Sequence, residues 1–120
     1  MESYTILVAE KDPTVARSLG VSLNAHFREI KIVQSFDELT SVIPRTRADA
    51  IVADLETVSL DNITHLSRDS RLPVVCIHRV PDDELWTAAM EAGAVDVCGN
   101  FDVSGMIRAI TLNRHNIQAA

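Results

Sequence analysis

Apolar residues along the chain follow two alternating patterns. Five short apolar runs, rich in β-branched residues, predict buried strands at Tyr4–Ala9, Glu29–Gln34, Ala50–Asp54, Pro73–Ile77 and Val95–Cys98. Between these runs, apolar residues recur every three or four positions, which predicts amphipathic helices. Strands that alternate with helices favour a parallel sheet covered on both faces. We therefore expect a doubly wound α/β fold with right-handed crossover connections.

Capping residues predict where several helices begin and end. The first helix is expected to begin at Pro13 with Asp12 as its cap, and the fourth to begin after Asp82 or Asp83 and to end at Gly93. Pro44 is expected to end the second helix. The buried stripe of the first helix is expected to comprise Val15, Leu19, Val21, Leu23 and Phe27.

Composition narrows the class of protein. The 120 residues are 47% hydrophobic, which suits one folded domain spanning residues 1–120; such a domain can form the N-terminal part of a longer protein. A net charge of −6 argues against nucleic-acid or membrane binding by this domain, although a local basic patch can still exist. We expect a cytoplasmic protein, because no signal-peptide pattern begins the chain, and we expect Cys76 and Cys98 to be buried free thiols.

Polar residues follow the strands where functional groups collect in such sheets. In a sheet of strand order 2-1-3-4-5, the first and third strands are neighbours, so Glu10 and Asp54 at their ends should lie close together. Two adjacent carboxylates repel unless a cation lies between them. Either Mg²⁺ or a lysine can supply that charge. His78 and Asn100 end the fourth and fifth strands.

Four segments resemble the receiver domain of bacterial two-component response regulators. They are Ile6–Pro13, Ile51–Leu55, Leu72–Ile77 and Ala92–Asp96, the last containing an AGA-x-D turn. The resemblance implies a flavodoxin-like, five-stranded fold of order 2-1-3-4-5. It also implies that a histidine kinase phosphorylates Asp54, with Mg²⁺ held by Glu10, Asp54 and the backbone carbonyl of Glu56.

Much of the chemistry that the family uses is replaced in this sequence. Lys11 stands where the family has a second acid, His78 where it has a hydroxyl residue, and Asn100 where it has a lysine. We expect the Lys11 ammonium to take the place of the metal, to keep Glu10 and Asp54 ionised, and to make Mg²⁺ binding weak or absent. No other cofactor is expected.

Three pocket residues allow two interpretations each. Asp12 either caps the first helix or turns into the pocket as a second carboxylate. His78 either points to solvent or donates a hydrogen bond to a phosphate. Lys11 either enters the pocket or stays a solvated loop charge.

We expect a pseudo-receiver, which binds a protein partner or dimerises without regulated phosphorylation and is not an enzyme. The resemblance places the contact face on the fourth helix, fifth strand and fifth helix, with Trp86, Met90, Val97 and Arg108 as its candidate residues. The alternative is a working switch, phosphorylated at Asp54 with Glu10 and Asp12 as metal ligands. A nucleotide-binding or enzymatic module is disfavoured, because the loop EKDPT after the first strand has no glycine.

Overall fold

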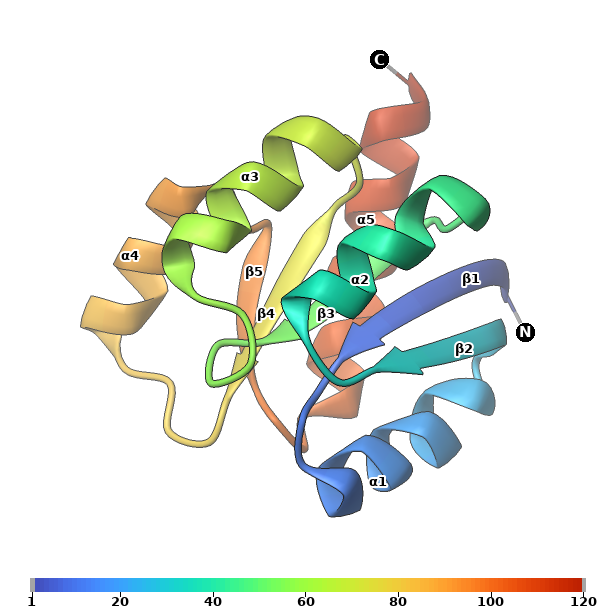
Figure 1. The fold of residues 1–120 in the computed structure, drawn as a ribbon, viewed down its shortest axis with the longest axis horizontal. Helices are drawn as coiled ribbons and strands as arrows, with labels where there is room; N and C mark the ends of the chain where they lie inside the picture. Colours follow the sequence, from blue (N-terminus) through green and yellow to red (C-terminus); the bar gives the residue numbers. More distant parts are fainter. Residues whose placement is uncertain (1, 120) are drawn as a thin grey trace.

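The sheet has five parallel strands in the predicted order. The computed structural model describes residues 2–119, with side chains described for residues 3–113. The strands lie in the order β2-β1-β3-β4-β5, as Figure 1 shows, which confirms the predicted flavodoxin-like fold. Their bounds are β1 Glu2–Ala9, β2 Phe27–Val33, β3 Ala50–Asp54, β4 Val74–His78 and β5 Asp96–Gly99.

Helices cover both faces of this sheet (Figure 1). The helices are α1 Pro13–Asn24, α2 Phe36–Val42, α3 Leu60–Ser70, α4 Asp83–Ala92 and α5 Val103–Ala119, with a 3₁₀ turn η1 at Ile43–Arg45. Buried residues of α1 and α5, such as Leu23 and Ile110, pack on one face of the sheet. Buried residues of α2, α3 and α4, such as Leu39 and Ile63, pack on the other. Within the described residues, no helix is long and apolar enough to cross a bilayer.

Caps fix the helix starts that the sequence predicted. Asp12 Oδ1 accepts hydrogen bonds from the backbone N–H groups of Thr14 (2.9 Å) and Val15 (3.3 Å), at the start of α1. Asp82 Oδ1 accepts one from Leu85 N–H (2.8 Å) at the start of α4. These bonds satisfy backbone donors that have no partner within the helix. Asp12 therefore has the capping role, as one of its two interpretations predicted.

Two residues of the predicted buried stripe of α1 are not part of it. The helix ends at Asn24, and His26 N–H closes a turn onto Leu23 C=O (2.9 Å). Phe27 is therefore the first residue of β2, where its ring stacks on Tyr4 at a centroid distance of 6.2 Å. Val21 is exposed on α1. Phe27 was assigned to the wrong element, because an apolar residue alone does not show which element contains it. Val21 is in the predicted helix but on its exposed side, because it is two positions from both Leu19 and Leu23 and residues two apart do not share a helix face.

The two cysteines are free and buried, as predicted. Cys76 packs with the α2–α4 face of the sheet and Cys98 with the α1 and α5 face. Because their side chains lie on opposite faces, they cannot form a disulfide without rebuilding the strands. Burial raises the pKa of Cys76 to about 12 and that of Cys98 to about 11, which keeps both thiols protonated and unreactive near neutral pH.

Gly93 is the predicted glycine at the end of α4. Its φ of 114° is one that residues with a Cβ rarely adopt, and a Cβ there would overlap Ser67 Oγ on α3. We expect Gly93→Ala to lower the free energy of unfolding by roughly 1–3 kcal/mol, measured by chemical denaturation. Gly99→Ala is the matched control, since a Cβ added at Gly99 would meet no other group within 4 Å. Equal losses in both variants would contradict this account of Gly93.

Candidate functional site

A small cavity lies at the carboxyl ends of the strands. Its volume is about 80 Å³, and it is bounded by the end of β3, the first turn of α1 and the loops that follow β1, β3, β4 and β5. The lining residues are Glu10, Lys11, Asp12, Val15, Asp54, Glu56, Arg79 and Asn100. Of the pocket residues predicted from the sequence, only His78 is absent from this lining.

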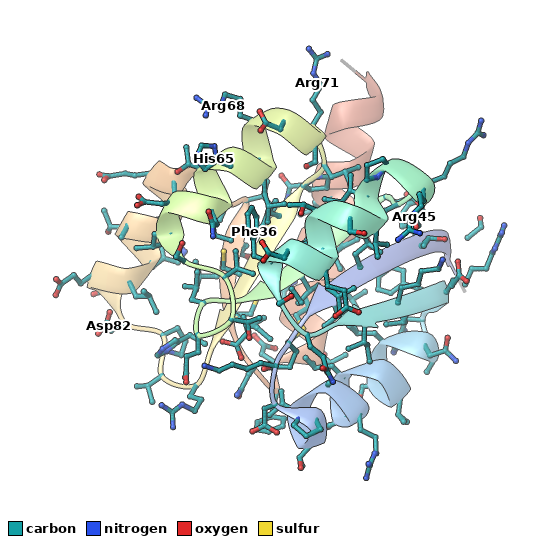
Figure 2. The ribbon with its side chains drawn as sticks, in the orientation of Figure 1. Phe36, Arg45, His65, Arg68, Arg71 and Asp82 are labelled. Atoms are coloured by element: carbon teal, nitrogen blue, oxygen red, sulfur yellow. The ribbon has the colours of Figure 1, made fainter. Side chains whose placement is uncertain are left out.

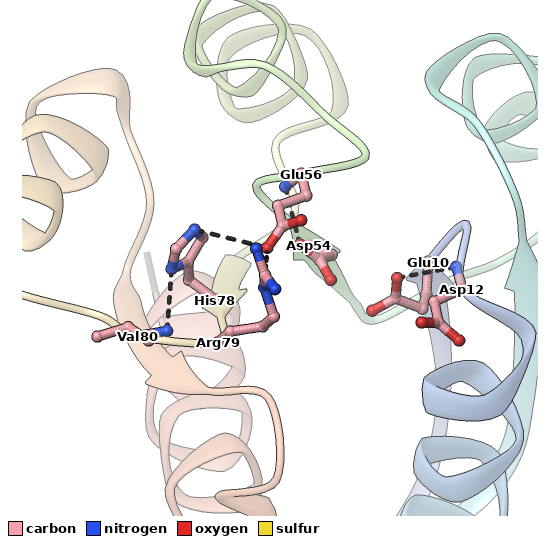
Figure 3. Close-up of polar contacts among 7 residues, drawn as sticks. All are labelled: Glu10, Asp12, Asp54, Glu56, His78, Arg79 and Val80. Carbon is pink, nitrogen blue, oxygen red and sulfur yellow. Dashed lines mark hydrogen bonds and ion pairs between the residues drawn. The ribbon is translucent and has the colours of Figure 1, made fainter.

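Glu10 and Asp54 form a buried acid pair in this cavity. Ala9 pairs with Ala53 across β1 and β3, so the carboxylates that follow them lie side by side. Glu10 is 2% exposed and Asp54 5% exposed. The adjacency predicted from strand order is therefore present, and Figure 3 shows the two carboxyl groups directed toward each other.

Backbone N–H groups satisfy part of this acid pair. Asp12 N–H donates to Glu10 Oε2 (3.1 Å), and Glu56 N–H donates to Asp54 Oδ1 (2.8 Å), as Figure 3 shows. Glu10 Oε1 is fully buried and accepts no hydrogen bond from any described residue. A buried carboxylate oxygen without a donor is costly, so this atom favours a proton on the pair or a cation beside it.

The environment of Glu10 disfavours its ionised form. Burial is the main cause that raises the pKa of Glu10 from 4.5 to about 8, and the neighbouring carboxyl group of Asp54 and the negative charge of Asp12 act in the same direction. The hydrogen bond from the Asp12 backbone lowers the pKa, but it does not offset the other effects. This environment favours the protonated form of Glu10, whereas the sequence led us to expect an ionised Glu10.

Lys11 lines the cavity but does not neutralise the acid pair. Its side chain is exposed, and it forms no ion pair with either carboxylate in the region where side chains are described. Its backbone N–H donates to Thr57 Oγ1 (3.0 Å), which ties the loop after β1 to the loop after β3. The Lys11 ammonium thus lies at the rim of the cavity, because water solvates this charge better than the buried pocket would.

The cavity offers an incomplete set of ligands for Mg²⁺. Glu10 and Asp54 supply two carboxylates, and the unsatisfied Glu10 Oε1 suits a cation. Asp12 Oδ1, however, is occupied by its two cap hydrogen bonds, and the cations Lys11 and Arg79 line the same space. Within the described residues, no cluster of three or more His, Cys, Asp or Glu side chains is arranged to hold a metal ion. Weak Mg²⁺ binding therefore stays a prediction.

Arg79 is a pocket residue that the sequence did not reveal. Its Nε donates to Glu56 Oε1 at 2.6 Å, which joins the loop after β4 to the loop after β3 (Figure 3). An arginine in a polar loop carries no signal that a carboxylate 23 positions earlier faces it. The side chain of Glu56 is consequently engaged in this pair, and only its backbone N–H contacts Asp54.

His78 is turned away from Asp54. Its Nδ1 accepts a hydrogen bond from Val80 N–H (3.1 Å), so the proton of the neutral ring is on Nε2. Nε2 lies 3.7 Å from Glu56 Oε1 (Figure 3). Neither interpretation made from the sequence describes this position, because the ring is held between its own loop and Glu56 instead of facing solvent or the acid pair.

Asn100 reaches the cavity without adding charge. It is 7% exposed, and its backbone N–H donates to His78 C=O (3.1 Å), which joins the ends of β4 and β5. An amide at this position can offer a hydrogen bond but no positive charge.

The candidate contact residues lie along the edge of the sheet that ends in β5. Trp86 on α4 is 46% exposed, and Arg108 on α5 is exposed. Met90 on α4 and Val97 on β5 are half-buried. Leu112 on α5 adds another exposed apolar side chain. Trp86 and Leu112 therefore give this edge two exposed apolar side chains.

Comparison with known proteins identifies the fold. No family model matches the chain, and no curated protein matches it by sequence. Among solved structures, FixJ-N is 26% identical, with 96% of each chain covered and a TM-score of 0.81. The signal receiver domain of a modulated diguanylate cyclase from Desulfovibrio desulfuricans G20 is 16% identical, with 98% of each chain covered and a TM-score of 0.83. A Francisella response regulator 1452 receiver domain is 18% identical, covering 95% of this chain and 98% of its own, with a TM-score of 0.81. The chain thus has the fold of response-regulator receiver domains.

The raised pKa of Glu10 predicts a specific dependence of stability on pH. The folded state binds a proton that the unfolded state releases above pH 4.5, so stability should fall as the pH rises from about 4.5 to about 8. The side chain introduced by Glu10→Gln is neutral at every pH. We therefore expect this variant to lose roughly 2–5 kcal/mol less free energy of unfolding than the wild-type protein over this pH range, measured by urea denaturation.

Glu91→Gln is the matched control, because Glu91 is an exposed acid on α4. It should leave the pH dependence unchanged. An unchanged slope in Glu10→Gln would show instead that Glu10 is ionised in the folded protein, as an ion pair with Lys11 would require.

Proposed function

We propose that this chain is a signal-transduction domain of the pseudo-receiver type, which acts through protein contacts without regulated phosphorylation. The receiver fold supports the signalling role. The observation that carries the rest is the state of the cavity, where Glu10 and Asp54 share a buried space that no described cation neutralises.

Phosphoryl transfer needs positive charge placed where negative charge develops. The family places a lysine at position 100, and Asn100 cannot supply that charge. Lys11 and Arg79 line the cavity but pair with neither Glu10 nor Asp54, since Arg79 pairs with Glu56 and the Lys11 side chain is exposed. His78, at the hydroxyl position, is engaged by Val80 and lies beside Glu56. The missing positive charge raises the barrier to phosphorylation, and His78 leaves no hydroxyl group to report it.

The contact surface proposed for this domain is the α4–β5–α5 edge. β5 is the last strand of the sheet, and the helices on either side of it present Trp86, Arg108 and Leu112 to solvent. Tryptophan and arginine are the residues that most often dominate binding energy at protein interfaces. The partner is a second copy of the chain or another signalling protein.

A phosphorylation switch is the second candidate, and one observation favours it. Asp54 lines an accessible cavity, and its Oδ1 is oriented by Glu56 N–H. A committed histidine kinase would then be the partner, with Glu10 and Asp12 as the carboxylates nearest to a metal.

Incubation with Mg²⁺ and a small phosphodonor, followed by intact-mass measurement, separates the two candidates. We expect no gain of a phosphoryl group, because the cavity lacks the charge that stabilises transfer. The double variant Lys11→Asp/Asn100→Lys restores the second acid and the lysine of the family and should gain the group. A gain in the wild-type protein that disappears in Asp54→Asn would overturn the pseudo-receiver proposal.

Replacing Trp86 tests the contact surface. We expect Trp86→Ala to weaken association through this edge by about tenfold or more, measured by sedimentation velocity over a range of concentrations, since exposed anchors of this kind contribute strongly to binding. Glu91→Ala, on the same helix, is the control and should have little effect. If Trp86→Ala keeps both its fold and its association state, Trp86 is not part of the interface.

A further inference from the structure

A groove lies at the amino ends of the strands, at the end of the sheet opposite the acid pair. Helix α2 has only seven residues, and its buried Leu39 packs near Val33, at the far end of β2. Side chains two apart on a strand share a face, so Lys31 and Glu29 lie on the same face as Val33 but beyond the reach of α2. Both are exposed, and the uncovered part of the sheet becomes a groove of about 510 Å³.

Four cations line this groove. Arg28 and Lys31 come from β2, and both line the groove because the register of β2 with β1 is irregular between Phe27 and Glu29. Arg45 and Arg47 come from η1 and the segment that leads into β3. Figure 2 shows Arg45 at the end of α2, on the side of the molecule where β1 and β2 begin. All four side chains are exposed, and none forms an ion pair with a carboxylate among residues 3–113. The Arg45 guanidinium donates hydrogen bonds to Ser41 C=O and Ser41 Oγ (3.2 Å each), which leaves its remaining N–H groups for a ligand. Four of the chain's 11 basic residues are thus concentrated in one place, despite the net charge of −6.

The acids of the groove are directed toward Thr5 on β1. Asp49 Oδ2 accepts a hydrogen bond from Thr5 N–H (2.8 Å), and Glu29 Oε1 accepts one from Thr5 Oγ1 (3.5 Å). Hydroxyl groups of Ser3 and Thr46 also line the groove. None of the described residues that line the groove is aromatic, so they offer hydrogen bonds and charge but no ring for stacking.

We propose that this basic groove, defined by Arg28, Lys31, Arg45 and Arg47, binds a small anion that carries two or more linked phosphate groups. Guanidinium groups donate paired hydrogen bonds that match phosphate oxygens, and hydroxyl groups add further donors. The four cations come from two separate segments, so a phosphate chain can contact more of them than a single phosphate can. The volume lies within the range of small-molecule sites, and the concave shape concentrates the positive potential.

This site is separate from the acid pair. The groove lies at the amino ends of the parallel strands and the acid pair at their carboxyl ends, which are opposite ends of the sheet. The proposal therefore does not rest on the pseudo-receiver function. The shared chemistry is the phosphate chain, which can be free or attached to a nucleoside. The lack of a stacking residue favours recognition of the phosphates alone.

Titration calorimetry with tripolyphosphate at physiological salt tests the proposal. We expect saturable binding that is weakened about tenfold or more in Arg45→Gln/Arg47→Gln, since hydrogen bonds to charged groups are lost. Arg17→Gln/Arg68→Gln removes the same charge from exposed positions on α1 and α3 and should keep the wild-type affinity. Circular dichroism establishes that both variants remain folded.

Adenosine triphosphate and hexaglutamate complete the test. Equal affinity for adenosine triphosphate and tripolyphosphate indicates that the site binds a free phosphate chain. Tighter binding of adenosine triphosphate, lost in Arg45→Gln/Arg47→Gln, indicates that it binds a nucleotide. Both outcomes support the site. Three results would overturn it: no saturation at low millimolar tripolyphosphate, equal losses in the two double variants, or hexaglutamate binding as tightly as tripolyphosphate, which would indicate an acidic protein segment.

Discussion

The structure of the site depends on one electrostatic constraint, the burial of two carboxylates at the ends of adjacent strands. The sheet order places β1 beside β3, and the register of Ala9 with Ala53 leaves Glu10 and Asp54 no room to separate. Burial and mutual repulsion both oppose ionisation of the pair. Whatever occupies this space must lower its negative charge, and in this arrangement a proton on Glu10 does so.

The fold follows from the sequence because its signals are local and repeated. Buried β-branched runs, the caps at Asp12 and Asp82, and Gly93 each specify an element or its end without reference to distant parts of the chain. Phe27 is the instructive exception. Its apolar character fits both the end of a helix and the start of a strand, and its pairing with β1 and its contact with Tyr4 place it in the strand.

The site follows from the sequence only as far as strand ends define it. Strand order correctly places Glu10 beside Asp54, and it brings Asn100 to the same cavity. The directions of long loop side chains are a different matter, because they depend on tertiary partners and on exposure to water. Lys11 therefore extends outward, and Arg79 meets Glu56 from a loop whose sequence gives no indication of the contact.

Side-chain ties across the rim of the cavity have a mechanical consequence. Lys11 N–H is bound to Thr57, and Arg79 is bound to Glu56, so three loops are linked through the segment that directly follows Asp54. Arg79 also lies in the connection that leads into α4. A protein that docks on α4 and shifts this connection would therefore displace the backbone beside Asp54. The α4 surface and the Asp54 loop are thus mechanically coupled without chemical modification of either.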